Sequence, residues 1–265
     1  MNSTYVLDTA ISRCHWKSDL PSVAPANTWK KGTRSRRIRR LLLDHRYISL
    51  FSLLVTVAAQ SCLFGKTAGS GLCFIFLAHE AGHVLASRQF NIPVLWPIFV
   101  PKVGAVILLK EEIKDPYIEA CLGISGPIAG LLATGAVDFI GIVKDFSDLK
   151  FCATAGYAIH LFNLIPFGDL DGGHVASFIG KWLWIFGAAL LLGLFFQFSS
   201  LAWHTNLVLL FILCSGVMKM SCWMSSKGSN SGIPKRPGKK ARLIMASLYG
   251  LLILICVLGL FSKNL

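Results

Sequence analysis

The chain has 265 residues, of which 54% are hydrophobic and only 15% carry a charge. A soluble domain of this length needs more charge to cover its surface, so this composition and a mean hydropathy of +0.61 exclude an ordinary soluble protein and favour a membrane protein. The formal net charge of +13 would also suit a nucleic-acid binder, but the positions of the basic residues argue against one.

Half of the 26 lysines and arginines lie in two clusters, and each cluster adjoins an apolar run. The first cluster has seven members and the second has six: Lys30, Lys31, Arg34, Arg36, Arg37, Arg39 and Arg40, then Lys227, Lys235, Arg236, Lys239, Lys240 and Arg242. Basic residues beside apolar runs are typical of the cytoplasmic flanks of membrane spans. We therefore expect the lipid bilayer, and no nucleic acid, to be a partner of this chain.

In chain order, residues 1–40 are polar and basic and predict a cytoplasmic N-terminal arm, while residues 41–265 predict a membrane-embedded domain. The first two apolar runs, 47–64 and 70–87, are long enough to cross a bilayer. The second run also contains two histidines and a glutamate, which a helix facing lipid does not tolerate without a function.

Residues 92–110 are apolar enough to cross the membrane, but Pro93, Pro97 and Pro101 exclude a continuous helix. Their β-branched residues favour an extended chain, and Gly104 adds a turn signal. Because an unpaired strand edge cannot face lipid, this segment predicts a re-entrant, hairpin-like structure packed against the protein.

The remaining apolar runs predict the other membrane helices. A third span at 120–143 carries Gly126 and Gly130, which share one helix face and favour close helix packing. A fourth helix is expected to start near residue 151, bend at Pro166 and continue to about residue 180. Further spans are expected at 182–198, 201–220 and 243–261. The predicted fold is an all-α polytopic membrane protein with about six to seven transmembrane helices.

The sequence His79-Glu80-Ala81-Gly82-His83 is an HExxH motif. On a helix, residues four apart share a face, so both imidazoles can reach one metal ion, and Glu80 can accept a proton from a water beside it. The alternative is a pair of core histidines packed in the bundle. Two histidines and a glutamate within a span are costly without a partner, which favours the metal site.

A catalytic zinc usually has three protein ligands. Asp171 is a buried candidate for the third, since it lies in an apolar run and is followed by two glycines that would let another helix come close. The neighbouring Asp169 is an alternative ligand, although it is more simply explained as a residue that faces water at the bend.

The HEAGH motif in one span, followed by N-x-x-P and L-D-G in a later span, resembles the site-2 protease family of intramembrane metalloproteases. The resemblance covers about residues 70–180 and includes the GPIAG run. It implies a three-helix catalytic core, with one zinc ion held by His79, His83 and Asp171 and with Glu80 as general base. It also implies that Asn163 holds substrate or stabilises the oxyanion, and that the substrates are transmembrane segments of other proteins.

Other polar residues have less definite roles. His160 lies three residues before Asn163 and lines the cavity in one interpretation, while His174 either orients Asp171 or serves as an interfacial histidine. Trp182, Trp184 and Trp203 are interpreted as anchors at the membrane interface.

The sequence thus predicts hydrolysis of peptide bonds in or near transmembrane segments. Two alternatives remain: a zinc-binding membrane protein without protease activity, such as a transporter or chaperone, and a scaffold in which the motif has arisen by chance. The expected location is a bacterial cell membrane, with the N-terminus in the cytoplasm, and the oligomeric state is not predicted.

Overall fold

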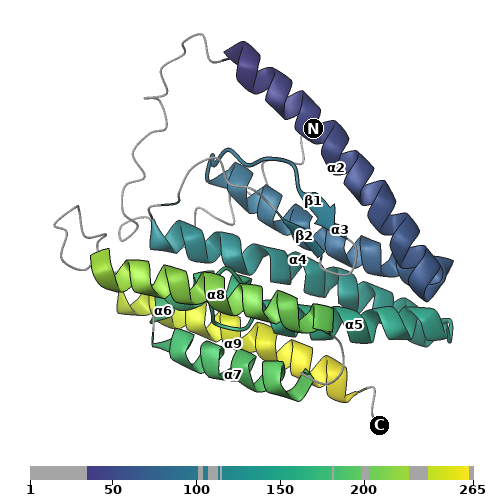
Figure 1. Cartoon of the computed structure of the whole chain (residues 1–265). Coiled ribbons are helices and arrows are strands. Elements are labelled where there is room, and N and C mark those ends of the chain that lie inside the picture. Colours follow the sequence, from purple (N-terminus) through teal and green to yellow (C-terminus); the bar gives the residue numbers. More distant parts are fainter. Residues whose placement is uncertain are drawn as a thin grey trace, which may run out of the picture. The chain divides into compact units, whose positions relative to one another are not determined.

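The computed structural model describes residues 35–100, 104–106, 113, 115–180, 182–198, 203–226 and 238–262, with backbone only for 35–44, 104–106, 198, 203–205 and 222–226 (Figure 1). Residues 40–265 form one packed unit, to which the following description applies. Most of the expected N-terminal arm, part of the second basic cluster and much of the 92–110 segment lie outside the described residues.

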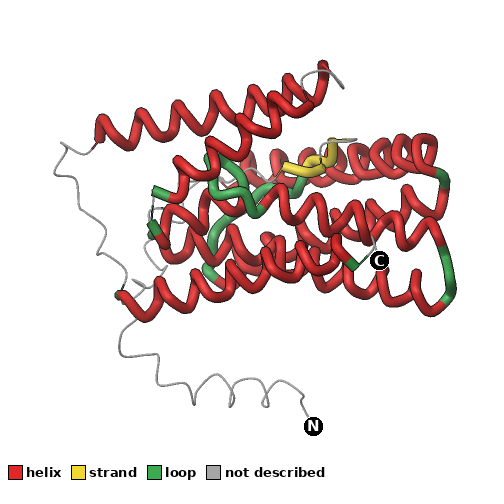
Figure 2. Tube along the Cα trace, turned by 90° about the horizontal axis from the view of Figure 1, so that it is seen from below, coloured by secondary structure: helices red, strands yellow, loops and turns green. Residues whose placement is uncertain are grey.

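The described chain is built almost entirely of helices, as the composition predicts. In chain order these are α2 (Ser35–Phe64), α3 (Lys66–Gln89), α4 (Pro116–Val143), α5 (Ser147–Asn163), α6 (Asp171–Ile179), α7 (Leu183–Phe198), α8 (Trp203–Ser226) and α9 (Lys239–Phe261). Figure 2 shows the helices in red and the two short strands, in yellow, beside them. Helices α3, α4 and α5 pack on one another.

Helix α4 is the central element, because it packs on α3, α5, α6 and α9. It begins after Asp115, whose side chain accepts a hydrogen bond from the Tyr117 N–H at 2.8 Å, and Pro116 occupies its first turn, where no N–H partner is needed. Helix α9 is joined to the end of α5 by a hydrogen bond from the Tyr249 hydroxyl to the Leu164 carbonyl. The core between these helices is apolar and includes Ile124, Leu131, Tyr157, Val175, Met245 and Leu252.

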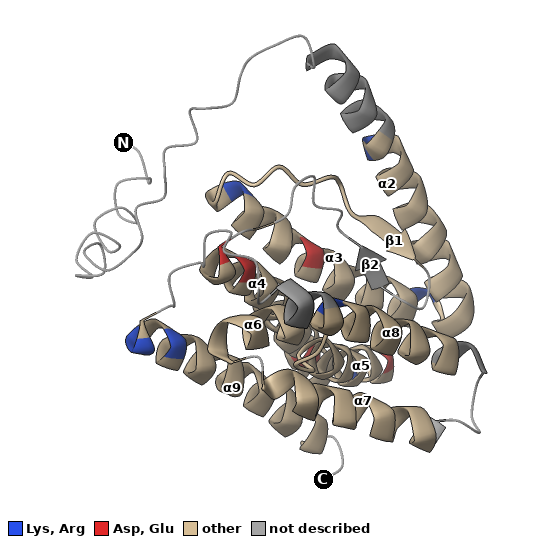
Figure 3. Cartoon of the chain, turned by 60° about the vertical axis from the view of Figure 1, so that its left-hand side comes forward, with Lys and Arg blue, Asp and Glu red and all other residues tan. Residues whose placement is uncertain are grey.

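Four of the described helices are long and apolar enough to cross a membrane: His45–Phe64, Lys66–Gln89, Pro116–Val143 and Lys239–Phe261. The stretches Leu183–Gln197 and Asn206–Ser221 are apolar but shorter. Leu132, Phe139 and Phe211 are 73%, 69% and 74% exposed, and charged side chains are sparse along the described helices (Figure 3). These features agree with an all-α membrane protein, while the count of six to seven spans stays a prediction.

The expected fourth helix is not continuous, which corrects the sequence interpretation. Helix α5 ends at Asn163, and α6 begins only at Asp171. Pro166 has no N–H to continue the helical bonding, and Gly168 takes a positive φ of 60°, a conformation that glycine adopts readily. The proline therefore belongs to a loop rather than to a bend, and Asp171 is the first residue of a helix rather than an internal one.

The 92–110 segment contains two short antiparallel strands, β1 (Ile98–Val100) and β2 (Gly104–Val106), with Phe99 opposite Ala105. The Phe99 N–H donates to the Ser52 hydroxyl of α2 at 3.1 Å, so one edge of β1 is tied to that helix. The second strand, β2, lies against α3, the helix that carries the HExxH motif (Figure 1). A strand pair is therefore present, and its re-entrant position in the bilayer stays a prediction.

Candidate metal centre

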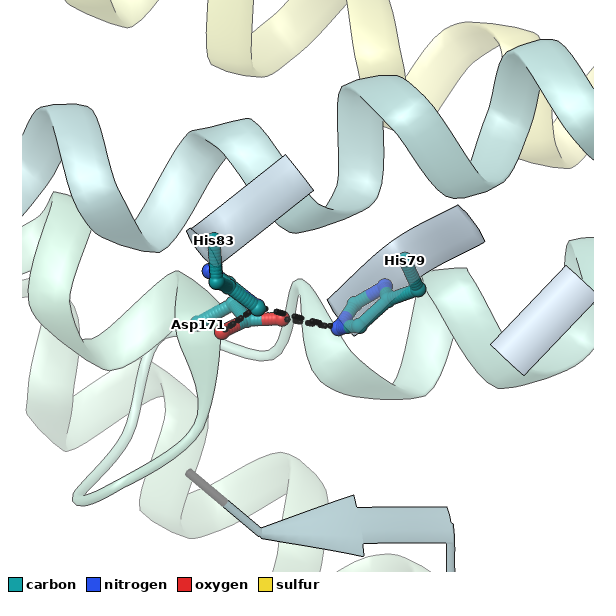
Figure 4. Close-up of side chains that lie close together, drawn as sticks. All are labelled: His79, His83 and Asp171. Carbon is teal, nitrogen blue, oxygen red and sulfur yellow. Dashed lines mark hydrogen bonds and ion pairs between the residues drawn. The ribbon is translucent and has the colours of Figure 1, made fainter. Parts of the chain in front are cut away.

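His79 and His83 lie one turn apart on α3 and point to the same side of that helix. Their Nε2 atoms are 3.1 Å apart, and both rings point toward the Asp171 carboxylate (Figure 4). His79 is buried, with an exposed fraction of 5%. The spacing of four residues therefore directs two imidazole nitrogens at one point, as the motif predicts.

Asp171 completes the cluster from the first position of α6. One carboxylate oxygen lies 3.2 Å from His79 Nε2, and the other lies 3.3 Å from His83 Nε2. A potential ligand atom from each of the three residues lies within 4.8 Å of the others. Two stretches of chain that are far apart in sequence thus meet at one point, as the sequence analysis requires. Asp169 is not part of this cluster. Its carboxylate is half-exposed and pairs with the ammonium group of Lys219.

The two glycines after Asp171 have a different role from the expected one. A Cβ atom at Gly172 would fall on the carbonyl of Leu164, and one at Gly173 would lie 2.7 Å from the Phe167 carbonyl carbon. They therefore make room for the preceding loop rather than for another helix. The Gly173 carbonyl accepts a hydrogen bond from Trp184 Nε1 at 3.1 Å, and Trp184 is buried, so its interpretation as an interface anchor is wrong.

The ring of His83 is held in place by a backbone atom of α4. Its Nδ1 lies 2.8 Å from the carbonyl oxygen of Leu122. A carbonyl oxygen can only accept, so Nδ1 carries the proton, and in the neutral ring Nε2 keeps the lone pair that a metal ion requires. This hydrogen bond fixes both the tautomer and the orientation of the ring.

The GPIAG run of α4 forms one wall of the centre. A Cβ atom at Gly126 would fall on the imidazole of His83, and one at Gly130 would fall on the imidazole of His160 and lie 3.1 Å from the Cβ of His79. The close approach that the glycine spacing predicts is therefore real, and what approaches the glycines is a group of histidine rings.

Glu80 follows His79 on α3 and is buried, with an exposed fraction of 7%. It directly follows a proposed ligand and lies on the helix that carries both histidines. Asn163 is the half-buried last residue of α5, and its side chain makes no hydrogen bond to the described residues. The role of Glu80 as general base and the role of Asn163 in holding substrate or stabilising the oxyanion stay predictions.

Two further histidines whose roles the sequence left open lie near the centre. His160 of α5 stacks on His79, with ring centroids 5.2 Å apart and planes at 9°. His174 of α6 forms a hydrogen bond with the carboxylate of Glu119 of α4, with Nδ1 at 2.8 Å from Oε1, so it joins these two helices and does not bond to Asp171. Sequence reasoning did not single out Glu119, because only the packing of α4 on α6 brings it to His174.

The donor set fits a zinc ion. A tetrahedral zinc with bonds of about 2.0 to 2.1 Å holds its ligand atoms about 3.3 to 3.4 Å apart. The two imidazole nitrogens are 3.1 Å apart, close to this value, and each lies 3.2 to 3.3 Å from a different oxygen of the Asp171 carboxylate. With one donor atom taken from each residue, the three donors lie within 4.8 Å of one another. Two imidazoles and one carboxylate also form a ligand set found in catalytic zinc sites.

A comparison with models of known protein families finds no match. The chain is, however, similar to plant zinc metalloproteases. It is 28% identical over 190 residues to "Probable zinc metalloprotease EGY2, chloroplastic" of Arabidopsis thaliana, a match that covers 52% of this chain. It is 27% identical over 142 residues to proteins of the same name from Oryza sativa subsp. indica and subsp. japonica, which covers 37% of this chain.

The matches span 33% of the Arabidopsis protein and 26% of each rice protein, so the chain corresponds to about a third or less of these curated relatives. The similarity supports the resemblance to the site-2 protease family that the two motifs indicate. The relatives are named as chloroplastic, which does not fit the expected bacterial cell membrane. The expectation of a membrane protein with several spans agrees with the apolar helices.

Proposed function

We propose that this chain is an intramembrane zinc metalloprotease that hydrolyses peptide bonds in or near transmembrane segments of membrane-anchored proteins. The observation that carries the proposal is the convergence of His79, His83 and Asp171, whose potential ligand atoms lie within 4.8 Å of one another. The similarity to proteins named as zinc metalloproteases supports the same assignment.

The position of the centre along α3 favours a substrate within the bilayer. At 1.5 Å per residue, His79 lies about 20 Å from the start of α3 at Lys66 and about 15 Å from its end at Gln89. This helix is long and apolar enough to cross a membrane, so the metal ligands lie deep within it. A peptide bond at that depth belongs to a membrane segment.

In this proposal each residue of the site has its own role in hydrolysis. A zinc ion held by His79, His83 and Asp171 would lower the pKa of a water molecule and polarise the substrate carbonyl. The Glu80 carboxylate accepts the proton from the attacking water and later returns it to the leaving amine. The amide of Asn163 donates a hydrogen bond to the carbonyl oxygen as negative charge develops on it.

A helical substrate hides its carbonyl groups in hydrogen bonds, so it must unwind before it is cleaved. The strand pair offers a place for the extended chain, because one edge of β1 is tied to α2 while β2 lies beside the metal-site helix. We therefore propose that the unwound substrate adds as a strand to this hairpin.

Replacing Glu80 with glutamine tests the function directly. Glu80→Gln removes the proton acceptor but none of the proposed ligands, so we expect the purified protein to keep one zinc ion per chain and to lose cleavage. The measurement is a comparison of the membrane-anchored proteins that are shortened in cells expressing the wild type or Glu80→Gln. Asp145→Asn, an acid-to-amide change in the exposed loop after α4, is the matched control and should cleave as the wild type does.

The outcomes separate the alternatives. Cleavage that persists in Glu80→Gln would rule out the proposed mechanism. A protein that binds zinc but shortens no membrane protein in any form would be a transporter or chaperone rather than a protease. Purified wild type without stoichiometric zinc would identify the motif as part of a scaffold.

A further inference from the structure

The two histidines of the HExxH motif are oriented in different ways. A metal-binding histidine is normally held by a hydrogen bond at the ring nitrogen that does not bind the metal. His83 has such a bond, from Nδ1 to the carbonyl of Leu122 at 2.8 Å. Nδ1 of His79 is buried and has no hydrogen-bond partner within the described parts of the chain. At Nδ1, therefore, no hydrogen bond to a described residue fixes the plane of the His79 ring.

The flat face of His160 lies against that ring. The two imidazoles are nearly parallel, at 9°, with centroids 5.2 Å apart, and His160 is completely buried on α5. Its other surroundings also restrict it, because its ring edge lies over Gly130 of α4, where a Cβ atom would collide with it. His160 is thus enclosed between the backbone of α4 and the ring of a proposed zinc ligand.

The chemistry of His160 favours a role at the centre over a role in packing. Both of its ring nitrogens are buried, and neither has a well-aligned hydrogen-bond partner among the described residues, although the backbone of Gly130 lies beside the ring. Burying polar atoms without partners costs free energy, and a leucine of similar volume would fill the space without that cost. An unpartnered polar group in a fully buried place is a feature that calls for a functional explanation.

We propose that His160 is a positioning residue that stacks on His79 and holds its imidazole in the plane needed for zinc binding. The proposal rests on the function proposed above. It assigns to α5 a part in the metal centre beyond Asn163, and it gives Gly130 the role of providing space for the stacked pair.

The first experiment compares His160→Leu with His160→Phe in purified full-length protein. Leucine fills the space without a flat face, so we expect zinc affinity, measured by competition with a chelator, to fall about 10- to 100-fold. The visible spectrum of the cobalt-substituted protein should also change, because the ligand geometry changes. Phenylalanine keeps a flat ring and should restore both the affinity and the spectrum toward the wild type.

A purely structural role for His160 predicts a different result. In that case His160→Leu would lower the thermal stability of the metal-free protein, whereas a positioning role leaves that stability unchanged or raises it, because an unpartnered polar group is removed. Equal zinc affinity in His160→Leu and the wild type would overturn the proposal. An equal loss in the leucine and phenylalanine variants would overturn it as well, because the ring nitrogens would then be what matters.

A second pair of variants, on α4, tests the stacking of His160 on His79 without changing His160. It serves if the His160 variants do not fold. Gly130→Ala places a methyl group on the His160 ring and should weaken zinc binding, while Gly135→Ala, on the same helix, meets nothing within 4 Å and should not. Equal zinc affinity in these two variants would contradict the proposed role. If the wild type itself binds no zinc, the proposed function fails first, so the two failures are distinguishable.

Discussion

At the scale of single residues, the spacing of the motif carries most of the prediction. His79 and His83 meet because helical periodicity places residues four apart on one face, and this can be read from the sequence. The hydrogen bond from His83 to Leu122, the stacking of His160 and the contact of Gly126 with His83 could not be read in this way. They depend on how α4 and α5 are rotated against α3, and that rotation is a property of tertiary packing.

Which aspartate is the third zinc ligand, Asp171 or Asp169, can also be tested at the scale of single residues. Asp171→Asn should abolish stoichiometric zinc binding, because a neutral amide replaces the carboxylate that contacts both imidazoles. Asp169→Asn should keep its zinc, since that carboxylate pairs with Lys219. Metal analysis of the two purified variants gives the result. Loss of zinc from Asp169→Asn alone would reverse the assignment.

At the scale of elements, hydropathy predicted the presence of helices better than their ends. The runs at 47–64, 70–87 and 120–143 lie within α2, α3 and α4. The break before α6 was missed because a proline within an apolar run was taken as a bend. What turns the bend into a loop is the positive φ of Gly168 and the packing of that loop on Gly172 and Gly173, neither of which leaves a pattern in hydropathy.

The attachment of the hairpin to α2 can be tested at the same scale. Ser52→Ala removes the acceptor of the Phe99 N–H, a bond whose net contribution is about 1 kcal/mol, so the KM for a membrane substrate should rise about five-fold with kcat and zinc content unchanged. Ser70→Ala is the control, because that exposed hydroxyl bonds only within its own helix. A fall in kcat without a change in KM would argue against a role of the hairpin in holding substrate.

At the scale of the whole molecule, the composition is enough to predict a helical membrane protein but not the number of spans. Four described helices satisfy the length and hydropathy of a span, while α7 and α8 contain shorter apolar stretches. Helices α5 and α6 occupy the run that was expected to form one bent helix. The count of six to seven spans stays a prediction.

Zinc removal is the prediction that belongs to this scale, because the proposed ion joins α3 to α6. A ligand present at 100 times its dissociation constant stabilises the folded state by about 2.7 kcal/mol, so a chelator should lower the thermal unfolding temperature in detergent. The same treatment should leave Asp171→Asn unaffected. An equal unfolding temperature with and without the chelator in the wild type would argue against a resident ion.

Position 126, which has no side chain, limits the directions from which a polypeptide could reach the proposed metal ligands. Because the backbone of α4 lies directly against the His83 ring, the space on that side is already filled by protein atoms. The stacked His160 ring covers His79 in the same way from α5. These two directions are closed, so we expect the substrate of the proposed protease to approach from another side of α3, the helix against which β2 lies.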